Sequence, residues 1–229
     1  MIPVAFILAA GRGERMRPLT DATPKPLLVV GGKPLIAWQL ERLAAAGIRE
    51  VVINHAHLGE QLESAVGDGS RWGLRIAWSR EGTALETAGG IAKARDLLGT
   101  HPFLVVSGDI YTDFDFSKLS GVAEAIAKDS GRHAAHFVLV DNPPYHPAGD
   151  MGLAGGHVCR RGPLLTYANI AVFHPALFAD IAPGARLGLF PWAYRFVDEG
   201  RVTGERFAGE WENLGTPAHL AQLDRRLST

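Results

Sequence analysis

The sequence predicts an α/β fold, a doubly wound and mostly parallel sheet with helices on both faces. One observation behind this prediction is the uninterrupted apolar run Val4–Ala9, which is typical of a strand buried on both faces. Another is the alternation of strand-like and helix-like segments up to about residue 140. At 229 residues and 47% hydrophobic residues, the chain can bury a full core, and we expect a single domain over residues 1–229.

The first half of the chain shows this alternation most clearly. After the strand at 4–9, Ile36, Leu40 and Leu43 recur at helical spacing. Pro34 suits the first turn of that helix and Gly47 suits its end. Further strands are expected at 51–53, 74–78 and 103–106, and further helices at 58–66, 87–98 and 119–127.

The regular alternation of strands and helices ends after the strand expected at 134–140. Residues 141–163 mix proline, aspartate and glycine with short apolar pieces, which indicates an irregular lid or hairpin at the edge of the sheet. We expect this lid region to cover about 141–175. A strand at 167–173, a helix at 192–199, a strand at 202–207 and a final helix at 217–227 complete the prediction.

Composition excludes several partners and locations. The formal net charge is −1 and the basic residues are dispersed, which argues against nucleic acid and for a small anionic partner. Cys159 is the only cysteine, so no disulfide within the chain is possible. The chain enters a strand without a signal-like segment, and its apolar runs are far shorter than the roughly 20 residues of a membrane span. We therefore expect a cytoplasmic protein without membrane contact.

A glycine-bearing loop follows the first strand. Residues 7–20 read ILAAGRGERMRPLT, and residues 24–26 read PKP. Backbone N–H groups of such a loop can point at an anion, and two cations, Arg15 and Lys25, follow within a short distance. This pattern predicts a site for a triphosphate.

Other phosphate motifs fit the loop less well. Gly11-x-Gly13 also opens the dinucleotide-binding fingerprint, but Met16 stands where that fingerprint needs a small residue. A P-loop would end in Gly-Lys-Ser/Thr, which does not follow Gly11. A turn with an exposed basic face remains an alternative.

These residues resemble, at every position, the signature L-A-A-G-x-G-x-R-M/L-x-P-L-T and P-K-P of the sugar-1-phosphate nucleotidyltransferases. From end to end the chain is similar to the short bacterial N-acetylmuramate-1-phosphate uridylyltransferases of cell-wall recycling. The resemblance implies a Rossmann-like nucleotidyltransferase fold and transfer from a nucleoside triphosphate, UTP first, to a sugar 1-phosphate. Two alternatives stay open: a mannose-1-phosphate guanylyltransferase and a catalytically silent, nucleotide-sensing regulatory module.

The resemblance also implies which residues act on the phosphates. A phosphate monoester is already anionic near neutral pH, so no general base is needed and positioning cations with Mg²⁺ must do the work. Arg15 is expected to hold the β- and γ-phosphates, and Lys25 the α-phosphate and the sugar phosphate. Asp109 follows an apolar strand and is the expected Mg²⁺ ligand. Asn213 stands where the family has a second, charged ligand, which leaves the number of ions open.

The remaining candidates surround the base and the sugar. Nucleotide contacts are expected from Leu8, Ala9, Ala10, Gly11, Arg12, Gly13, Asn54 and Gly82. Sugar contacts are expected from Glu86, Thr87, Ser107, Asp141, Asp150, Thr166 and Asn169, with Glu86–Gly90 resembling the E-T-G-G-G segment of the muramate enzymes. An E-K-P triplet of the larger family is absent, and Arg160 and Arg161 are candidates to replace its lysine.

Two other groups of residues have structural explanations. Asp113 and Asp115 precede an expected helix and suit capping. His55-x-His57 and His157-x-Cys159 resemble ligand pairs, but neither has a second pair at zinc-site spacing. We do not expect zinc.

Overall fold

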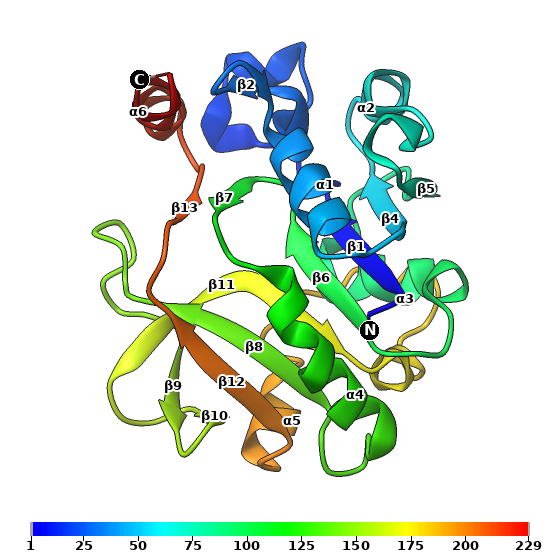
Figure 1. Ribbon diagram of the computed structural model, residues 1–229, viewed down its shortest axis with the longest axis vertical. Coiled ribbons are helices and arrows are strands. Elements are labelled where there is room, and N and C mark those ends of the chain that lie inside the picture. Colours follow the sequence, from blue (N-terminus) through cyan, green and yellow to red (C-terminus); the bar gives the residue numbers. More distant parts are fainter. Residues whose placement is uncertain (1, 229) are drawn as a thin grey trace.

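A nine-stranded mixed sheet crosses the computed structural model, which describes residues 2–228 (Figure 1). In spatial order its strands are β5 (Arg75–Arg80), β4 (Glu50–His55), β1 (Val4–Leu8), β6 (Phe103–Ser107), β11 (Leu164–Phe173), β8 (Ala135–Val140), β12 (Val202–Phe207), β10 (His157–Cys159) and β9 (Met151–Ala154). The strand order and the flanking helices confirm the predicted α/β fold class.

The sheet is parallel in its first half and mainly antiparallel in its second. Strands β5, β4, β1 and β6 pair parallel, as expected for strands joined by helical crossovers. Strand β11 runs antiparallel to both β6 and β8, and β9 and β10 form an antiparallel hairpin. Only β12 restores a parallel pair, with β8. The expectation of a mostly parallel sheet therefore holds up to β6 and fails in the region of the lid.

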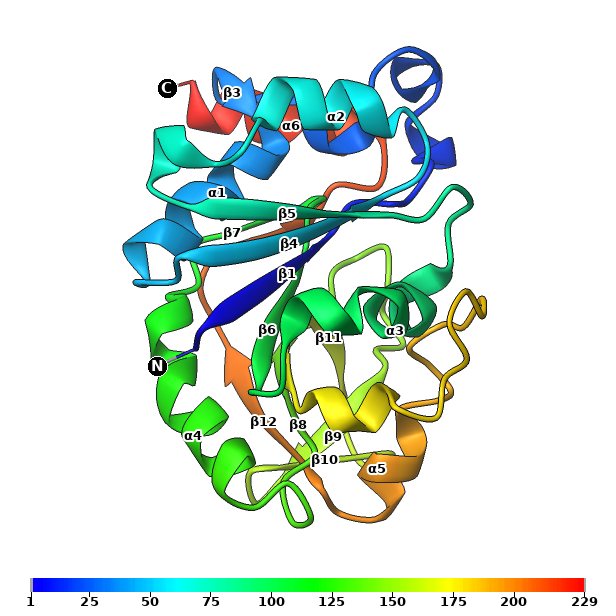
Figure 2. The ribbon, with the colours of Figure 1, turned by 90° about the vertical axis from the view of Figure 1, so that its right-hand side faces the viewer.

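The helices lie on both faces, close to the ranges expected from the sequence. They are α1 (Leu35–Ala45), α2 (Gly59–Val66), α3 (Glu86–Leu98), α4 (Ser120–Lys128), α5 (Tyr194–Asp198) and α6 (Pro217–Leu227). Short 3-10 helices cover Glu14–Met16, Leu19–Asp21, Lys25–Leu27, Ser70–Trp72, Phe116–Leu119 and Pro175–Phe178. Figure 2 shows α3 and α5 on the face opposite α4. No helix within residues 2–228 has both the length and the apolar character that crossing a bilayer requires.

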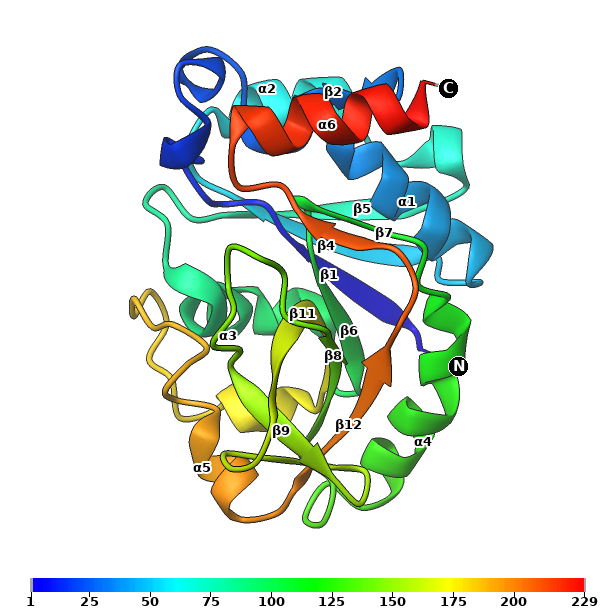
Figure 3. The ribbon, with the colours of Figure 1, turned by 90° about the vertical axis from the view of Figure 1, so that its left-hand side faces the viewer.

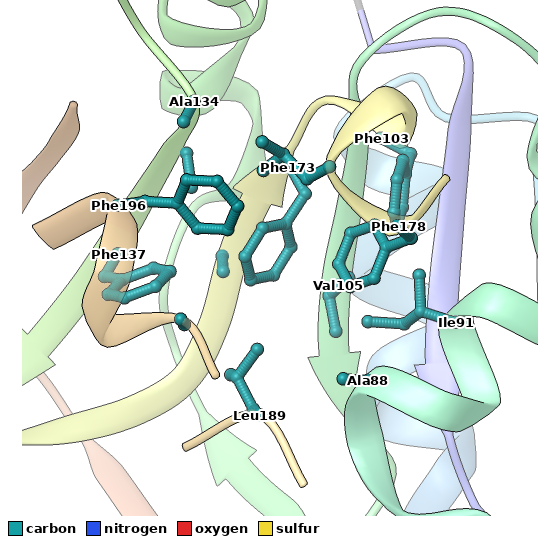
Figure 4. Close-up of a cluster of buried hydrophobic side chains, with 14 of the residues drawn as sticks. Ala88, Ile91, Phe103, Val105, Ala134, Phe137, Phe173, Phe178, Leu189 and Phe196 are labelled. Carbon is teal, nitrogen blue, oxygen red and sulfur yellow. The ribbon is translucent and has the colours of Figure 1, made fainter. Parts of the chain in front are cut away.

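Alternate residues of β1 enter two separate cores. Phe6 belongs to the cluster under α3 and α5, whereas Ile7 belongs to the cluster under α1, α2 and α4. In the first cluster, Phe178 packs edge-on against Phe173 with ring centroids 5.4 Å apart, and Phe103 lies beside both (Figure 4). Burial on both faces explains the continuous apolar run at residues 4–9 and makes β1 a rigid base for the loop that follows it.

Two short strand pairs were not expected from the sequence. Strand β2 (Val29–Val30) pairs with β3 (Lys33–Pro34), and β7 (Ile110–Thr112) pairs with β13 (Trp211–Asn213). Helix α6 packs through Leu223 in a third cluster with Val30, and it lies close to β7 and β13 (Figure 3). These contacts bring β13 and α6 to the end of β6.

Of the two capping candidates, only Asp115 caps a helix. Its carboxylate accepts hydrogen bonds from the backbone N–H and the hydroxyl of Ser117, and these bonds lower the pKa of Asp115. The Asp113 carboxylate instead accepts from the Glu210 N–H at 2.7 Å. Asp113 therefore joins the end of β7 to the segment before β13. The pairing of these two strands places the Glu210 N–H within hydrogen-bond distance of the carboxylate.

Candidate active site

Two adjoining cavities open where the parallel strands β1 and β6 end. The larger has a volume of about 680 Å³ and the smaller about 480 Å³. Both are lined by Leu8, Arg15, Glu86 and Thr87, so the two spaces meet at these residues. The carboxyl ends of parallel strands are where open α/β sheets bind ligands.

Most of the predicted site residues line these cavities. The larger cavity is lined by Leu8, Ala9, Ala10, Gly11, Arg12, Gly13, Arg15, Lys25, Asn54, Glu86, Thr87, Ser107 and Asp109. The smaller is lined by Asp150, Thr166, Asn169 and Asn213 together with the four shared residues. The larger cavity thus takes the phosphate-loop candidates and also Ser107 from the sugar candidates, whereas Asp150, Thr166 and Asn169 line the smaller cavity together with the metal candidate Asn213.

Lys25 and Asp109 form an ion pair in the wall of the larger cavity. The Nζ atom of Lys25 lies 2.6 Å from Oδ2 of Asp109. The lysine side chain is 9% exposed, whereas the aspartate side chain is 34% exposed. Pro24 precedes a short 3-10 helix of Lys25–Leu27, which fixes the backbone that carries the ammonium.

The glycine loop closes tightly on the stem of Lys25. Gly13 has φ of +64°, and a β-carbon there would lie 2.9 Å from Thr20 Cγ2 and 3.2 Å from Lys25 Cβ. The Thr20 hydroxyl also donates to the Gly13 carbonyl at 2.8 Å. The second glycine of the motif is thus required both by its left-handed conformation and by the close approach of two side chains.

Arg15 lies where the two cavities meet. Its guanidinium is exposed and lies against Gly215, where a β-carbon would be 3.3 Å from Nη1. The neighbouring Arg17 instead pairs with Asp21 at 3.0 Å and lines neither cavity. Of these two arginines in the loop, only Arg15 can reach ligands in both spaces.

Both polar atoms of the Asn54 side-chain amide form hydrogen bonds within the chain. Its Oδ1 accepts from the Ala9 N–H at 2.7 Å, and its Nδ2 donates to Glu81 Oε1 at 2.6 Å. The other oxygen of Glu81 accepts from the Leu85 N–H at 2.8 Å. Burial raises the pKa of Glu81, although these hydrogen bonds oppose the shift. Asn54 and the Ala9 N–H, both expected to contact the nucleotide, therefore shape the cavity wall through this network.

Two predicted residues lie outside both cavities. Gly82 borders a separate hollow beside His55 and Arg80. The Asp141 carboxylate pairs with Arg206 at 2.7 Å on the exposed surface. The placement of Gly82 and Asp141 corrects the expectation that they line the site.

The lid arginines also lie elsewhere. Arg160 pairs with Asp198 at 3.2 Å, and its guanidinium lies 4.6 Å from the ring centroid of Tyr194. Arg161 lines neither cavity. The β9–β10 hairpin that leads to them packs against β12 and α5. Neither Arg160 nor Arg161 therefore stands in a cavity wall, where a replacement for the missing lysine was expected.

The smaller cavity is built from side chains that are already hydrogen-bonded. Asp150 accepts from the Tyr167 N–H at 2.8 Å and contacts His146 Nε2 at 2.9 Å. The Thr166 hydroxyl donates to Asn142 Oδ1 at 2.9 Å. Asn169 has φ of +58° within an irregular stretch of β11, a conformation that asparagine tolerates better than most residues. Hydrogen bonds within the chain thus hold this wall of the smaller cavity.

Asn213, which lines the smaller cavity, has a buried side-chain oxygen, Oδ1, without a hydrogen-bond partner among the described residues. Strand pairing places Asn213 opposite Ile110, the residue after Asp109, and the Leu214 N–H donates to the Asp109 carbonyl at 3.1 Å. A buried oxygen without a donor is costly unless something else satisfies it.

Several cavity residues were missed by the sequence analysis. Arg186 lines the larger cavity and pairs with Glu86 at 2.7 Å. Its loop approaches α3 so closely that a β-carbon on Gly89 would lie 2.2 Å from the Ala185 carbonyl oxygen. The paired glycines of α3 signal a close contact, but nothing local says which segment makes it. The smaller cavity adds Tyr145, His146 and Trp211.

The histidine pairs have other partners. His55 Nε2 lies 2.5 Å from Glu63 Oε1, and His57 Nε2 lies 3.3 Å from the Thr20 carbonyl. His157 contacts the Gly155 carbonyl at 3.3 Å, and the Cys159 thiol donates to the Arg161 carbonyl. Within residues 2–228, no three His, Cys, Asp or Glu side chains gather as a metal-binding group.

The fold is a mixed α/β sheet, and the glycine loop, the buried Lys25 and the Asp109 carboxylate lie together at the strand ends. This combination is that of a phosphate-binding α/β protein. The chain belongs to the nucleotidyl transferase family, whose sequence model matches residues 4–149. It is 48% identical to an N-acetylmuramate α-1-phosphate uridylyltransferase of Neisseria meningitidis over 95% of both chains. It is 34% identical to the enzyme of the same name from Caulobacter vibrioides, over 98% of this chain and 97% of that one.

The fold also matches a solved structure. A Bacillus anthracis protein, described as a candidate glucose-1-phosphate thymidylyltransferase in complex with sucrose, superposes with a TM-score of 0.81. The match covers 100% of this chain and 96% of that chain at 20% identity. At this level of identity, the match shows that the two chains share the same fold.

Proposed function

We propose that this chain transfers the uridylyl group of UTP to N-acetylmuramate 1-phosphate, giving UDP-N-acetylmuramate and pyrophosphate in cell-wall recycling. The observation that carries the proposal is the meeting of two cavities at Arg15, with the Lys25–Asp109 pair in the wall of the larger one. One cavity can hold a triphosphate and the other a sugar phosphate. The likeness to the two uridylyltransferases supports the choice of substrates.

The reaction joins two anions. An oxygen of the sugar phosphate forms a bond to the α-phosphorus, the bond from that phosphorus to the bridging oxygen breaks, and the electron pair leaves with pyrophosphate. The sugar phosphate is a sufficient nucleophile because its second pKa is about 6. What the protein must supply is therefore alignment and positive charge.

The placement of the cations fits this task. Lys25 lies in the larger cavity and can hold the α-phosphate, where attack occurs. Arg15 lies between the cavities, where its fork of donors can hold the leaving pyrophosphate or the incoming sugar phosphate. Glycine-loop N–H groups provide further donors to phosphate oxygens.

We propose Mg²⁺ as the metal of this reaction. Mg²⁺ takes oxygen ligands and often binds through one or two protein groups plus substrate phosphates. The partly exposed Asp109 carboxylate and the orphaned Asn213 Oδ1 fit that donor set. When bound, the ion supplies positive charge to the triphosphate oxygens.

The sugar distinguishes this proposal from its relatives. N-acetylmuramate carries a lactyl carboxylate that N-acetylglucosamine lacks. Donors that line the smaller cavity include the Arg15 guanidinium and the Asn169 amide, which can meet such a group. A hydrogen bond to a charged group contributes about 1.5–3 kcal/mol, or roughly 10- to 100-fold in preference.

A substrate panel tests the proposal. Pyrophosphate release is measured with UTP, GTP, dTTP and CTP, each crossed with the 1-phosphates of N-acetylmuramate, N-acetylglucosamine, glucose and mannose. We expect the highest kcat/KM for UTP with N-acetylmuramate 1-phosphate, and N-acetylglucosamine 1-phosphate serves as the sugar matched in all but the lactyl group. A maximum for GTP with mannose 1-phosphate would replace the assignment with a guanylyltransferase. Nucleotide binding without any pyrophosphate release would indicate a regulatory module.

A further inference from the structure

Lys25 and Asp109 are each other's ion-pair partner in the structure. Their 2.6 Å separation is that of a short charge-assisted hydrogen bond. The ammonium lies on the side chain that is 9% exposed, so water competes poorly for it. Asp109 is thus occupied by a cation that the protein itself supplies.

The stem of Lys25 cannot swing freely. It lies against Gly13, whose loop is closed by the hydrogen bond from Thr20, and its backbone lies in the 3-10 helix that follows Pro24. Only the end of the side chain is free to change partner. Its reach is therefore limited to Asp109 and to whatever enters the larger cavity.

The proposed function gives both members of this pair other partners. A divalent cation at Asp109 would share a carboxylate whose Oδ2 already accepts from Lys25, and the two positive charges repel each other. A triphosphate in the cavity offers the ammonium new anionic acceptors. Binding of the metal and binding of the nucleotide each break the Lys25–Asp109 ion pair, so each makes the other more favourable.

We propose that Lys25 is a resident counter-ion that blocks Asp109 from binding a divalent cation until a nucleoside triphosphate draws the ammonium away. This inference rests on the proposed function for the identity of the ligands. Cation and nucleotide then bind cooperatively, and the coupling is reciprocal because both ligands act on one equilibrium. The free protein binds the cation weakly for this reason.

The expected coupling follows from the strength of the pair. Hydrogen bonds to charged groups correspond to roughly a 10- to 100-fold change in an equilibrium constant. Removing the ammonium should therefore tighten binding of the cation alone by about that factor. The same substitution should reduce the dependence of cation affinity on nucleotide by about that factor, leaving the part that comes from triphosphate oxygens acting as ligands.

Binding of Mn²⁺ provides the test, because this ion also prefers oxygen ligands and its free form is measured by electron paramagnetic resonance. The dissociation constant of Mn²⁺ is measured for the wild type and for Lys25→Met, with and without a non-hydrolysable UTP analogue. We expect Lys25→Met to bind Mn²⁺ alone 10- to 100-fold more tightly than the wild type. Lys25→Gln, which keeps a polar end, should show the same direction.

Two controls make the measurement specific. Lys33→Met removes a lysine that pairs with Glu41 and lies over the Trp38 ring, away from both cavities, and it should leave Mn²⁺ affinity and coupling unchanged. Asp109→Asn should abolish the tight Mn²⁺ binding gained in Lys25→Met when the two are combined. Circular dichroism establishes that each variant is folded.

The inference is overturned if folded Lys25→Met binds Mn²⁺ no more tightly than the wild type. Equal Mn²⁺ affinity of the wild type with and without the nucleotide analogue would overturn it as well. These measurements require no turnover. The proposed function fails separately, if the wild type releases no pyrophosphate from any substrate pair.

Discussion

Asn54 and Glu81 share a buried hydrogen bond of 2.6 Å that lies directly beneath helix α3. Gly90 is the residue of α3 above it, and a β-carbon there would lie 2.6 Å from Glu81 Oε1 and 2.8 Å from Asn54 Nδ2. Both side chains are held by further hydrogen bonds, because Asn54 Oδ1 accepts from the Ala9 N–H and Glu81 Oε2 accepts from the Leu85 N–H. The glycine thus lets the helix approach the network that shapes the nucleotide side of the cavity.

Gly90→Ala should destabilise the protein by about 1–3 kcal/mol, because an added methyl group must displace buried, hydrogen-bonded atoms. Gly121→Ala is the matched control, since Gly121 is an exposed helical glycine whose β-carbon would meet nothing within 4 Å. The control should gain roughly 0.5–1 kcal/mol from helix propensity. Urea unfolding compares the two. Equal effects would show that the network yields to the extra methyl group without cost.

Glu81 should impose a pH dependence on stability. Because burial raises the pKa of the folded carboxyl above its ordinary value of 4.5, its stabilising contribution is complete below that value. The contribution is lost as pH rises through the raised pKa. The free energy of unfolding of the wild type should therefore fall with pH across this window relative to Glu81→Gln, which does not titrate. Urea midpoints measured from pH 4 upward check the slope, and parallel curves would contradict the assignment.

Arg15→Ala should lower kcat by about 10²- to 10³-fold, the usual effect of removing one preorganised donor to developing charge. Arg17→Ala provides the comparison, because Arg17 lies in the same loop but pairs with Asp21 outside both cavities. It should retain nearly normal turnover. Steady-state kinetics at saturating UTP measure both. Near-normal turnover of Arg15→Ala would remove Arg15 from the phosphate site.

Asn213→Asp should make stability depend on Mg²⁺. The new carboxylate would stand where a buried oxygen already lacks a donor, so the variant should unfold more readily in the presence of a chelator. Mg²⁺ with UTP should restore its Tm and reduce the Mg²⁺ concentration needed for half-maximal turnover. Asn169→Asp, on the same cavity wall, should show neither response. An unchanged Mg²⁺ requirement in Asn213→Asp would assign Asn213 a structural role.

The sequence by itself determined the elements of the first half and the phosphate loop. Apolar periodicity is local, so it located β1, α1 and β4 within a few residues. The loop from Gly11 to Thr20 is also local, because its glycine conformation and its closing hydrogen bond lie within that segment. Such features can be predicted without knowing what packs against them.

The tertiary structure alone decided which distant segments complete the site. Glu86 meets Arg186 a hundred residues later because Gly89 admits the loop that carries Arg186, and the β7–β13 pair places Asn213 opposite Ile110, the residue after Asp109. Asp141 lies outside the site because the parallel pairing of β8 with β12 brings its segment beside Arg206 on the exposed surface. Local patterns specify which face of an element is apolar, but strand order and long-range packing decide which faces meet. That is why the sequence alone predicted the glycine loop and missed Arg186, Tyr145 and Trp211, which other segments bring to the cavities.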